Sequence, residues 1–428
     1  MKPLHAELWF MGRDRATMFW LSLAALITAT SIVVGIFEIE SQRSTIAQLT
    51  RADAEERRSV LETKKGWGSL AYYTFHLTYD EPSRLAFAAL GQRDNAPWKH
   101  RIRMLALEGQ IYEADGNNAV FALTGGFDFA FVASILLPLF VIFLLYGLRA
   151  DERTAGRFEL LSATASSAHA LWFMRAALRM AGLAICLLAP FVIGSLQQGA
   201  ETMPLAAACI AVLLHILFWW LITELIGRRM VSGALTLTLL IGMRLCLTVL
   251  IPAAIKLSVE QLIEVPEGAD ILLAQREAVN DAWDLPKEAT MAPFLERHPQ
   301  WRDYAKISKP FEWKWYFAFQ QVGDQTVQTL SEQYRRGRCQ RDHWAGWLSL
   351  LSPPTHLDRT LQMLARTDVE GSLAYERSVR AFHANLRAFF YPLLFEGRPF
   401  EASTLREMPS FAPQTGPSNR NNCSLTDS

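Results

Sequence analysis

Three polar side chains stand inside or at the end of long apolar runs, where an ionised group is costly. His215 lies in AVLLHILFWW, Arg244 interrupts residues 230–255, and Glu224 stands near the end of residues 203–225. An arginine at the centre of a transmembrane helix costs about 2.5–3.5 kcal/mol, so we expect Arg244 to face protein or water. A structural ion pair is our first interpretation, and a place along a translocation path is the alternative. Glu224 has the right sign for a partner, although its depth differs from that of Arg244.

His215 also has two interpretations, one structural and one functional. A polar ring in the middle of an apolar helix is expected to hydrogen-bond to a neighbouring helix. A role along a substrate path is the alternative.

The other candidate for chemistry is the charged segment LRADERTAGRFELLSATASS at residues 148–167, which lies between two apolar runs. Its charges cannot lie inside a bilayer, whereas Phe158, Leu160 and Leu161 offer an apolar side. An amphipathic helix along the membrane surface satisfies both demands, and it would offer a docking surface for a partner protein. A solvated turn with anchoring arginines is the alternative.

Motifs for catalysis by this chain are missing from the sequence. None of the phosphate loop GxxxxGK[ST], the zinc motif HExxH, the CxxC pair or the GxSxG nucleophile turn occurs. The spacing of His343 and His356 fits no metal-binding face of a helix. We therefore expect no enzymatic activity, metal or cofactor on this chain. Cys339 and Cys423 could pair in an oxidising compartment, but their spacing does not decide it.

Five apolar runs must position these residues. They cover residues 17–37, 128–148, 171–200, 203–225 and 230–255. A hydrophobic fraction of 51% would also suit a soluble protein, but runs of this length match a helix that crosses about 30 Å of hydrocarbon. We therefore predict an all-α integral membrane protein with about five transmembrane helices, the first being a retained signal anchor.

Positive charge is distributed unevenly over the connections between these runs. Lysine or arginine occurs in residues 1–16, in residues 149–170 and at Arg228 and Arg229, whereas residues 196–203 contain neither. Cytoplasmic loops of membrane proteins carry the excess of these residues. We therefore predict a cytoplasmic, amphipathic N-terminal segment at 1–16 and a cytoplasmic connection at 149–170.

Two long segments then fall on the extracytoplasmic side, at residues 38–127 and 256–410. Both are rich in helix formers and are predicted to be mainly helical. The first should continue the first transmembrane helix outward as a solvated helix. Four of its apolar residues are available for packing: Ile46, Leu49, Val60 and Leu61. Residues 411–428 are polar and rich in Pro, Ser and Asn, and are predicted to form a disordered tail.

The segment LHAELWFMGRDRATMFW, before and into the first apolar run, and DERTAGRFELLSATASS, between the second and third, resemble the permease subunits of ABC-2 type ABC transporters. In that family the second segment forms the coupling helix, which contacts the ATPase. The resemblance gives this role to eight residues: Asp151, Glu152, Arg153, Gly156, Arg157, Glu159, Leu160 and Leu161.

Further segments resemble a subgroup of this family that has two large extracytoplasmic segments and is catalogued as a domain of unknown function. They are PSRLAFAALGQRDNAPW, WLSLLSPPTHLDRTLQMLARTDVEGSLAYERSVRAF and MPSF. Two features depart from the subgroup. A glycine is usual at the position of Arg366, and MPSF is normally followed by a sixth transmembrane helix, which the polar tail replaces here.

The resemblance implies a permease subunit of an export-type ATP-driven transporter, with its N-terminus on the cytoplasmic side of the bacterial inner membrane. ATP and Mg²⁺ would bind a separate cytoplasmic ABC ATPase. The other partners would be a second permease subunit, identical or paralogous, and the lipid bilayer, and no nucleic acid. The alternative is a non-transporting scaffold or sensor that acts through its extracytoplasmic segments and has no ATPase partner.

Overall fold

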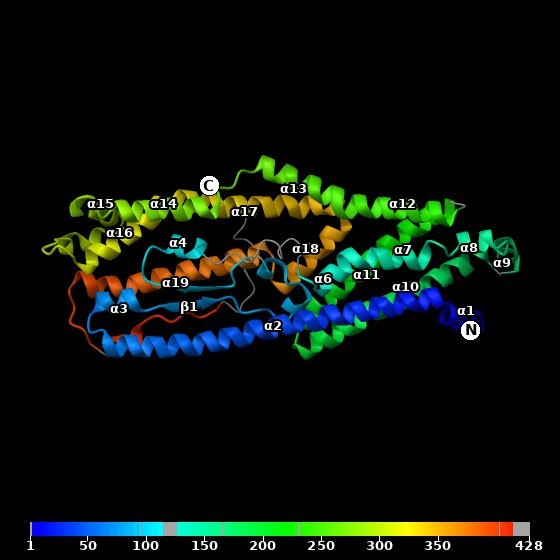
Figure 1. Ribbon diagram of the computed structural model, residues 1–428, viewed down its shortest axis with the longest axis horizontal. Coiled ribbons are helices and arrows are strands. Elements are labelled where there is room, and N and C mark those ends of the chain that lie inside the picture. Colours follow the sequence, from blue (N-terminus) through cyan, green and yellow to red (C-terminus); the bar gives the residue numbers. More distant parts are fainter. Residues whose placement is uncertain are drawn as a thin grey trace.

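The apolar runs of the sequence fold into helices that lie side by side in one half of an elongated molecule (Figure 1). The computed structural model describes residues 2–94, 96–113, 126–164, 167–229, 232–401 and 403–413. Within these ranges five helices are long and apolar enough to cross a membrane, namely Arg15–Thr63, Phe129–Thr154, His169–Gln197, Thr202–Arg229 and Gly233–Leu262. Each predicted transmembrane helix overlaps one of them, and the mainly helical class is confirmed.

We call the candidate spans, together with the short helices at the end of the bundle away from the rest of the chain, the bundle half. Its elements are α1 (Lys2–Arg13), α2 (Arg15–Thr63), α6 (Phe129–Phe131), η3 (Val132–Leu136), α7 (Leu137–Leu145), α8 (Ala150–Thr154), α9 (Phe158–Thr164), α10 (Ala168–Gln197), α11 (Thr202–Arg229), α12 (Gly233–Leu245), η4 (Cys246–Leu250) and α13 (Ile251–Leu262).

Two of the candidate spans contain a single π-helical turn. The turn η3 joins α6 to α7, and η4 joins α12 to α13. A proline follows each turn, Pro138 in α7 and Pro252 in α13. Because proline has no N–H to donate to the preceding turn, the helix loses a backbone hydrogen bond and widens locally. Backbone carbonyl groups in these turns are therefore available to side chains from other elements.

We call the rest of the described chain the distal region. Its elements are α3 (Trp67–Tyr73), β1 (His76–Tyr79), η1 (Ala86–Ala88), η2 (Gly91–Asp94), β2 (Lys99–Ile102), α4 (Leu107–Tyr112), α14 (Gly268–Asp281), α15 (Lys287–Arg297), η5 (Pro299–Tyr304), α16 (Trp313–Thr326), α17 (Gln328–Leu348), η6 (Ser349–Leu351), α18 (Pro353–Ala365), α19 (Val369–Phe395) and η7 (Thr404–Glu407).

The distal region contains a two-stranded antiparallel sheet, which the all-α prediction missed. The strands β1 and β2 pair His76 with Ile102 and Tyr79 with Lys99. In both strands a more buried side chain alternates with a more exposed one, which is the period of a strand. Each strand has four residues, which is too short for this period to stand out from the helical segments around it.

The long helix α2 connects the two halves of the molecule (Figure 1). Ile39 of α2 is buried in the core of the bundle half, and Ile46 is also buried. Val60 and Leu61, near its end, pack against a second core in the distal region. The predicted continuation of the first span as a helix that packs through these residues is therefore confirmed, whereas Leu49 is only partly buried.

Two parts of the predicted extracytoplasmic segments pack against the bundle itself. The η1 turn and α18 contribute to the same core as the candidate spans, α18 through Leu357, Leu361 and Ala365. Ser352, the N-cap of α18, donates a hydrogen bond of 2.6 Å to the carbonyl of Leu247 in the widened turn η4. These elements therefore close the end of the bundle that faces the distal region.

Arg366 ends α18 in a left-handed conformation, with φ of 57°. A residue with a Cβ atom loses about 1–2 kcal/mol in this region of φ and ψ, whereas glycine does not. The backbone at this position therefore favours glycine over the arginine that is present. The following residue holds the turn in place, because the Thr367 hydroxyl donates to the carbonyl of Ala89 at 2.7 Å.

Gly35 of α2 gives a direct test of how η1 packs on the bundle. A Cβ atom at Gly35 would lie 2.0 Å from the carbonyl oxygen of Phe87, a backbone atom that has little freedom to shift. We expect Gly35→Ala to lower the free energy of unfolding by about 1 kcal/mol or more through overpacking. Thermal unfolding of the full chain in detergent would measure it. Gly227→Ala is the matched control: nothing lies within 4 Å of its Cβ position, so no loss is expected. An equal effect of both substitutions would contradict the packing argument.

Candidate functional site

The charged segment between the second and third spans forms a bend of two short helices, α8 and α9. Figure 1 shows them beside α1 at one end of the molecule, opposite the end with α15 and α16. The prediction of one continuous amphipathic helix is wrong, because the helix is interrupted at Gly156, whose φ is 70°. The N–H of Gly156 bonds to the carbonyl of Arg153, and that of Arg157 bonds to the carbonyl of Glu152. This pair of bonds is the Schellman motif that ends helices at a left-handed glycine.

The α8–α9 bend is fixed to α10 by aromatic and charged contacts. The ring of Phe158 stacks on Trp172 of α10 with a centroid distance of 5.2 Å, and Arg153 lies over Phe158 at 4.6 Å. Glu152 accepts a hydrogen bond of 2.8 Å from Arg157 and lies 3.8 Å from Arg175 of α10. The hydrogen bond and charge of Glu152 raise the pKa of Arg157. The bend and the start of the third span are therefore linked mechanically.

The predicted coupling residues divide into those that hold the bend and those that face solvent. Glu152 and Arg153 are partly buried in the contacts just described, and Leu161 packs against the bundle core. Asp151, Gly156, Arg157, Glu159 and Leu160 are exposed. Leu160 keeps 65% of its surface exposed. The bend therefore presents a mixed charged and apolar surface at the end of the bundle.

Sequence reasoning missed a second layer of charged residues beneath the bend. Arg175 donates to Glu7 of α1 at 2.9 Å, and Arg179 donates to Asp14, the N-cap of α2, at 2.9 Å. Both arginines point from α10 toward the N-terminal segment, which they tie to the third span. The sequence signal was that Arg175 and Arg179 lie one helical turn apart and that the N-terminal segment contains acidic residues for both to bind.

Glu224 takes part in an ion pair, but its partner is not Arg244. It pairs with Arg149, just before α8, and accepts a hydrogen bond of 3.1 Å from Arg228 one helical turn away. Glu224 therefore stabilises the charged end of the bundle. It connects the end of α11 to the residue that leads into the α8–α9 bend.

Arg244 binds a backbone carbonyl, so the predicted structural ion pair is wrong for this residue. Its guanidinium donates to the carbonyl of Ile135, in the widened turn η3, at 3.0 Å, and the ion pairs of the described chain do not include it. His215 hydrogen-bonds to the backbone of Ser134 in the same turn and accepts from Trp219 at 3.2 Å. The predicted hydrogen bond from His215 to a neighbouring helix is therefore confirmed.

The contact of His215 with Ser134 is explained by Pro138. In a regular helix the N–H of residue 138 would bond to the carbonyl of residue 134, and proline removes that donor. Polar groups buried among helices must find partners, so His215 of α11 supplies the missing bond, and Arg244 of α12 binds the next carbonyl, that of Ile135. A proline inside the second span was the sequence signal for this site.

The remaining reactive side chains are the cysteines and the residue types that could bind a metal ion. Cys186, Cys209 and Cys246 are free, and Cys339 of α17 is disulfide-bonded. Cys423, which could pair with Cys339, lies outside the described residues, as does the tail from residue 414 onward. In the part of the chain that the structure describes, no group of three or more His, Cys, Asp or Glu residues is placed to hold a metal ion.

Comparison with known families identifies one related region. Residues 270–414 match a family model described as Domain of unknown function (DUF3526). This range holds α15 to α19 and most of α14, so it belongs to the distal region rather than to the candidate spans. Comparison with curated proteins and with solved structures finds no match. The matched family has no described activity.

Proposed function

We propose that this protein is a transmembrane permease subunit of an ABC-2 type ATP-driven transporter, which couples ATP hydrolysis by a separate ATPase to substrate movement across the bacterial inner membrane. The observation that carries the proposal is the α8–α9 bend. It lies at the end of two candidate spans, presents exposed charged and apolar side chains, and has the residues of the family's coupling helix.

The arrangement of positive charge supports a cytoplasmic position for the bend. The N-terminal helix α1 and the α8–α9 bend lie at the same end of the molecule (Figure 1), and the end of α11 with Arg228 is linked to this end through Glu224 and Arg149. These are the connections that carry lysine and arginine, as cytoplasmic loops do. The distal region would then lie outside the cytoplasm. The disulfide of Cys339 fits such a position, because extracytoplasmic compartments are oxidising.

The contacts of the bend suggest how force would pass into the bundle. Closure of an ATPase pair on the exposed surface would push on α8 and α9. The stack of Phe158 on Trp172 and the contact of Glu152 with Arg175 would transmit the displacement to α10. Movement of α10 relative to α7 would shift the population between inward-facing and outward-facing states. ATP and Mg²⁺ would be held by the partner, which explains the missing phosphate loop.

The fifth candidate span supports a second membrane subunit. Only 11% of its most apolar window is buried inside this chain. Its uncovered side chains include Leu239, Met243, Val249 and Leu250. We propose that this face contacts a second permease subunit, identical or paralogous, as well as lipid.

Substitutions in the bend test the proposed coupling. We expect Glu152→Lys combined with Gly156→Asp to lower the amount of co-purified ATPase at least about tenfold, because the contacts of Glu152 with Arg157 and Arg175 become repulsive and the left-handed cap is strained, so the bend changes shape. The tagged full chain would be purified from its native membranes and its partners identified by mass spectrometry. Membrane insertion should not change, because neither residue lies in an apolar run.

Glu277→Lys, an exposed charge reversal on α14 at the other end of the molecule, is the matched control and should leave the ATPase bound. Unchanged recovery of the ATPase with the α8–α9 variant would contradict the coupling role. Absence of any ATPase from the wild-type complex would instead favour a scaffold or sensor.

A further inference from the structure

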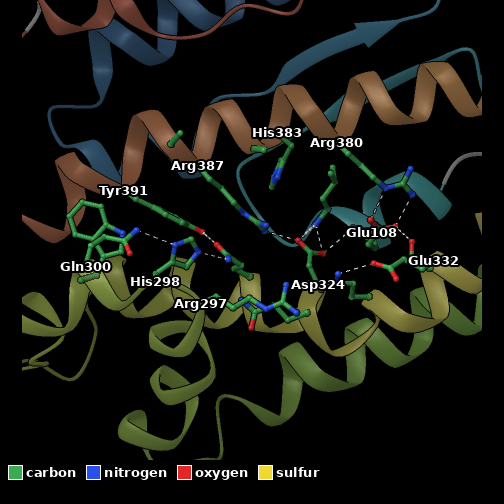
Figure 2. Close-up of a pocket in the computed structure, with 18 of the residues that line it drawn as sticks. Glu108, Arg297, His298, Gln300, Asp324, Glu332, Arg380, His383, Arg387 and Tyr391 are labelled. Carbon is green, nitrogen blue, oxygen red and sulfur yellow. Dashed lines mark hydrogen bonds and ion pairs between the residues drawn. The ribbon is translucent and has the colours of Figure 1, made fainter. Parts of the chain in front are cut away.

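A cavity of about 630 Å³ lies in the distal region, far from the α8–α9 bend. It is lined by residues of α4, α15, η5, α16, α17 and α19. Figure 2 shows His298, Gln300 and Tyr391 at one end of the cavity and Glu108 and Glu332 at the other. Its volume falls in the range of small-molecule binding sites, about 300–1,000 Å³.

One wall of the cavity is a fully bonded ion pair between α4 and α19. Arg380 donates to both carboxylate oxygens of Glu108, at 2.8 and 2.9 Å, and Ser331 adds a hydrogen bond of 2.7 Å. The carboxylate is buried and its oxygens are occupied. This pair therefore shapes the cavity, and its charges already compensate each other.

A second buried carboxylate is occupied in the same way. Asp324 accepts hydrogen bonds from the backbone N–H groups of Leu107 and Glu108, at 2.7 and 3.0 Å. It also accepts from the side chains of Gln275 at 2.8 Å and Arg387 at 2.6 Å. Donors from α4, α14 and α19 thus converge on one residue of α16, which fixes the floor of the cavity.

The far end of the cavity is ordered by a chain of neutral groups. Tyr391 donates to Gln321 at 2.6 Å, and the amide nitrogen of Gln321 lies 2.7 Å from Nε2 of His298. Burial lowers the pKa of His298, with the charges of Arg387 and Arg297 acting in the same direction, so its ring is neutral at pH 7. This end therefore adds no positive charge.

Three side chains that line the cavity have donor groups without an acceptor among the described residues. Arg335 of α17 and Arg297 of α15 line it, and the hydrogen bonds and ion pairs of the described residues include neither guanidinium. Burial lowers the pKa of Arg335, and the nearby charge of Arg380 acts in the same direction. The Nε2 of Gln325 is buried without a hydrogen-bond partner within the described ranges. Buried donors are normally paired, so the Nε2 of Gln325 needs an acceptor from outside the described residues. The guanidinium groups of the half-buried Arg335 and the exposed Arg297 are available to the same ligand.

The charge balance of the cavity limits the kind of acceptor. The pairs Arg380–Glu108 and Arg387–Asp324 cancel, which leaves Arg297 and Arg335 against the single carboxylate of Glu332. The surplus is therefore one positive charge. A monoanion would neutralise it, whereas a dianionic phosphate would leave uncompensated negative charge beside Glu332. Guanidinium groups also match the planar geometry of a carboxylate.

We propose that this cavity binds a small organic monocarboxylate, with its carboxylate toward Arg335 and Gln325 and its apolar part against Trp301 and Pro392. The side chains of Trp301 and Pro392 line the cavity, and an indole ring in a pocket favours aromatic or flat apolar groups. The proposal goes beyond the transport function and does not depend on an ATPase partner, because every residue that carries it lies in the distal region.

Binding of matched probes to the purified full chain in detergent micelles tests the charge. Isothermal titration calorimetry would compare indole-3-acetate with indole-3-acetamide, which has the same ring without the charge, and with phenyl phosphate. We expect saturable binding of indole-3-acetate and at least about tenfold weaker binding of the other two. Equal binding of the amide, stronger binding of phenyl phosphate, or no saturable binding of indole-3-acetate up to about 10 mM would each overturn the proposal.

Substitutions on α17 test the site. Arg335→Gln should weaken indole-3-acetate binding about tenfold or more, whereas Arg336→Gln, an exposed neighbour that does not line the cavity, should not change it. Arg335 loses no ion pair when substituted, so thermal unfolding should stay unchanged. If thermal unfolding changes, Gln325→Leu replaces this variant, because the Nε2 of Gln325 has no hydrogen-bond partner among the described residues to lose. The same loss of binding is expected, since the proposal places this amide on the carboxylate. Unchanged affinity in the stable variant would overturn the assignment.

Discussion

Arg380→Met is expected to lower the free energy of unfolding of the distal region by about 3–5 kcal/mol, the usual cost of breaking a buried ion pair. The side chains of Arg380 and Glu108 are 17% and 10% exposed, and the arginine binds both carboxylate oxygens. Methionine preserves most of the packing volume but leaves Glu108 with Ser331 as its remaining side-chain donor. The buried carboxylate then carries a charge without compensation.

Hydrogen–deuterium exchange of the full chain in detergent would measure this loss in α4 and α19, the two helices that the pair connects. Arg276→Met is the matched control, because its ion pair with Glu113 is exposed on both sides and should contribute less than about 1 kcal/mol. An equal increase of hydrogen–deuterium exchange in the two variants would show that burial does not raise the contribution of the Arg380–Glu108 pair to the free energy of unfolding.

The pH dependence of the same variant provides a second observation. Burial alone would raise the pKa of Glu108, but the hydrogen bonds and charge of Arg380, together with Ser331, hold it below its ordinary value. Removing Arg380 leaves burial as the larger effect, so the pKa of Glu108 should rise. Its protonation in mild acid then relieves the buried charge, and the difference from wild type should shrink as the pH falls.

Acidification from pH 7 to pH 5 is expected to lower the stability of the distal region, with about 2 kcal/mol of the loss due to His76. Burial, with the nearby charge of Arg57, lowers the pKa of His76 from 6.5 to about 3. Between these values the unfolded chain binds a proton that the folded chain does not. The contribution of His76 to the free energy of unfolding is therefore fully present above its ordinary pKa. It falls as the pH drops from the ordinary pKa to the folded pKa, and it levels off below about pH 3.

His76→Phe should remove about 2 kcal/mol of this pH dependence and should not reduce stability at pH 7. Neither ring nitrogen of His76 has a hydrogen-bond partner among the described residues, so phenylalanine loses no bond and keeps the ring contact with Phe382. Denaturant unfolding of the full chain at pH 7 and pH 5 would measure the effect.

Some dependence on pH should remain in the His76→Phe variant, because burial also lowers the pKa of His100 to about 4. His343→Phe, which replaces an exposed ring on α17, is the control. The same acid sensitivity in the His76→Phe variant and in wild type would show that the imidazole of His76 is not the proton acceptor.

The candidate spans could be predicted from the sequence because apolar length is a property of a continuous segment. The run at 17–37 and the charged helix formers after it also predicted that α2 continues beyond the span. The strand pair β1–β2 could not be found in this way, because its two four-residue segments stabilise each other only when they meet.

The internal break of the charged segment is a different case. Its composition correctly predicted helix and a surface position, but glycine permits both helical and left-handed conformations. Gly156 takes the left-handed one, and the stack of Phe158 on Trp172 defines the direction in which α9 leaves the bend. The sequence indicated an exposed charged segment, and the tertiary contacts determined its shape.

The tertiary structure alone decided which group each polar residue of the candidate spans binds. Sequence reasoning identified Arg244, Glu224 and His215 as residues that need partners, because a polar group in an apolar run is costly wherever the chain folds. Which partner each one takes depends on depth and on neighbouring helices. Glu224 meets Arg149 at the end of the bundle, whereas Arg244 and His215 reach the turn widened by Pro138.

The cavity of the distal region marks the limit of what the sequence by itself determined. Helical periodicity is local, so the sequence determined the class of fold, the candidate spans and the charged ends that lie between them. Glu108 and Arg380 are separated by 272 positions, and only the packing of α4 against α19 brings them together. That packing pairs their charges with each other, whereas Arg335 has no hydrogen-bond or ion-pair partner among the described residues. No spacing along the chain distinguishes a paired arginine from one that is available to a ligand.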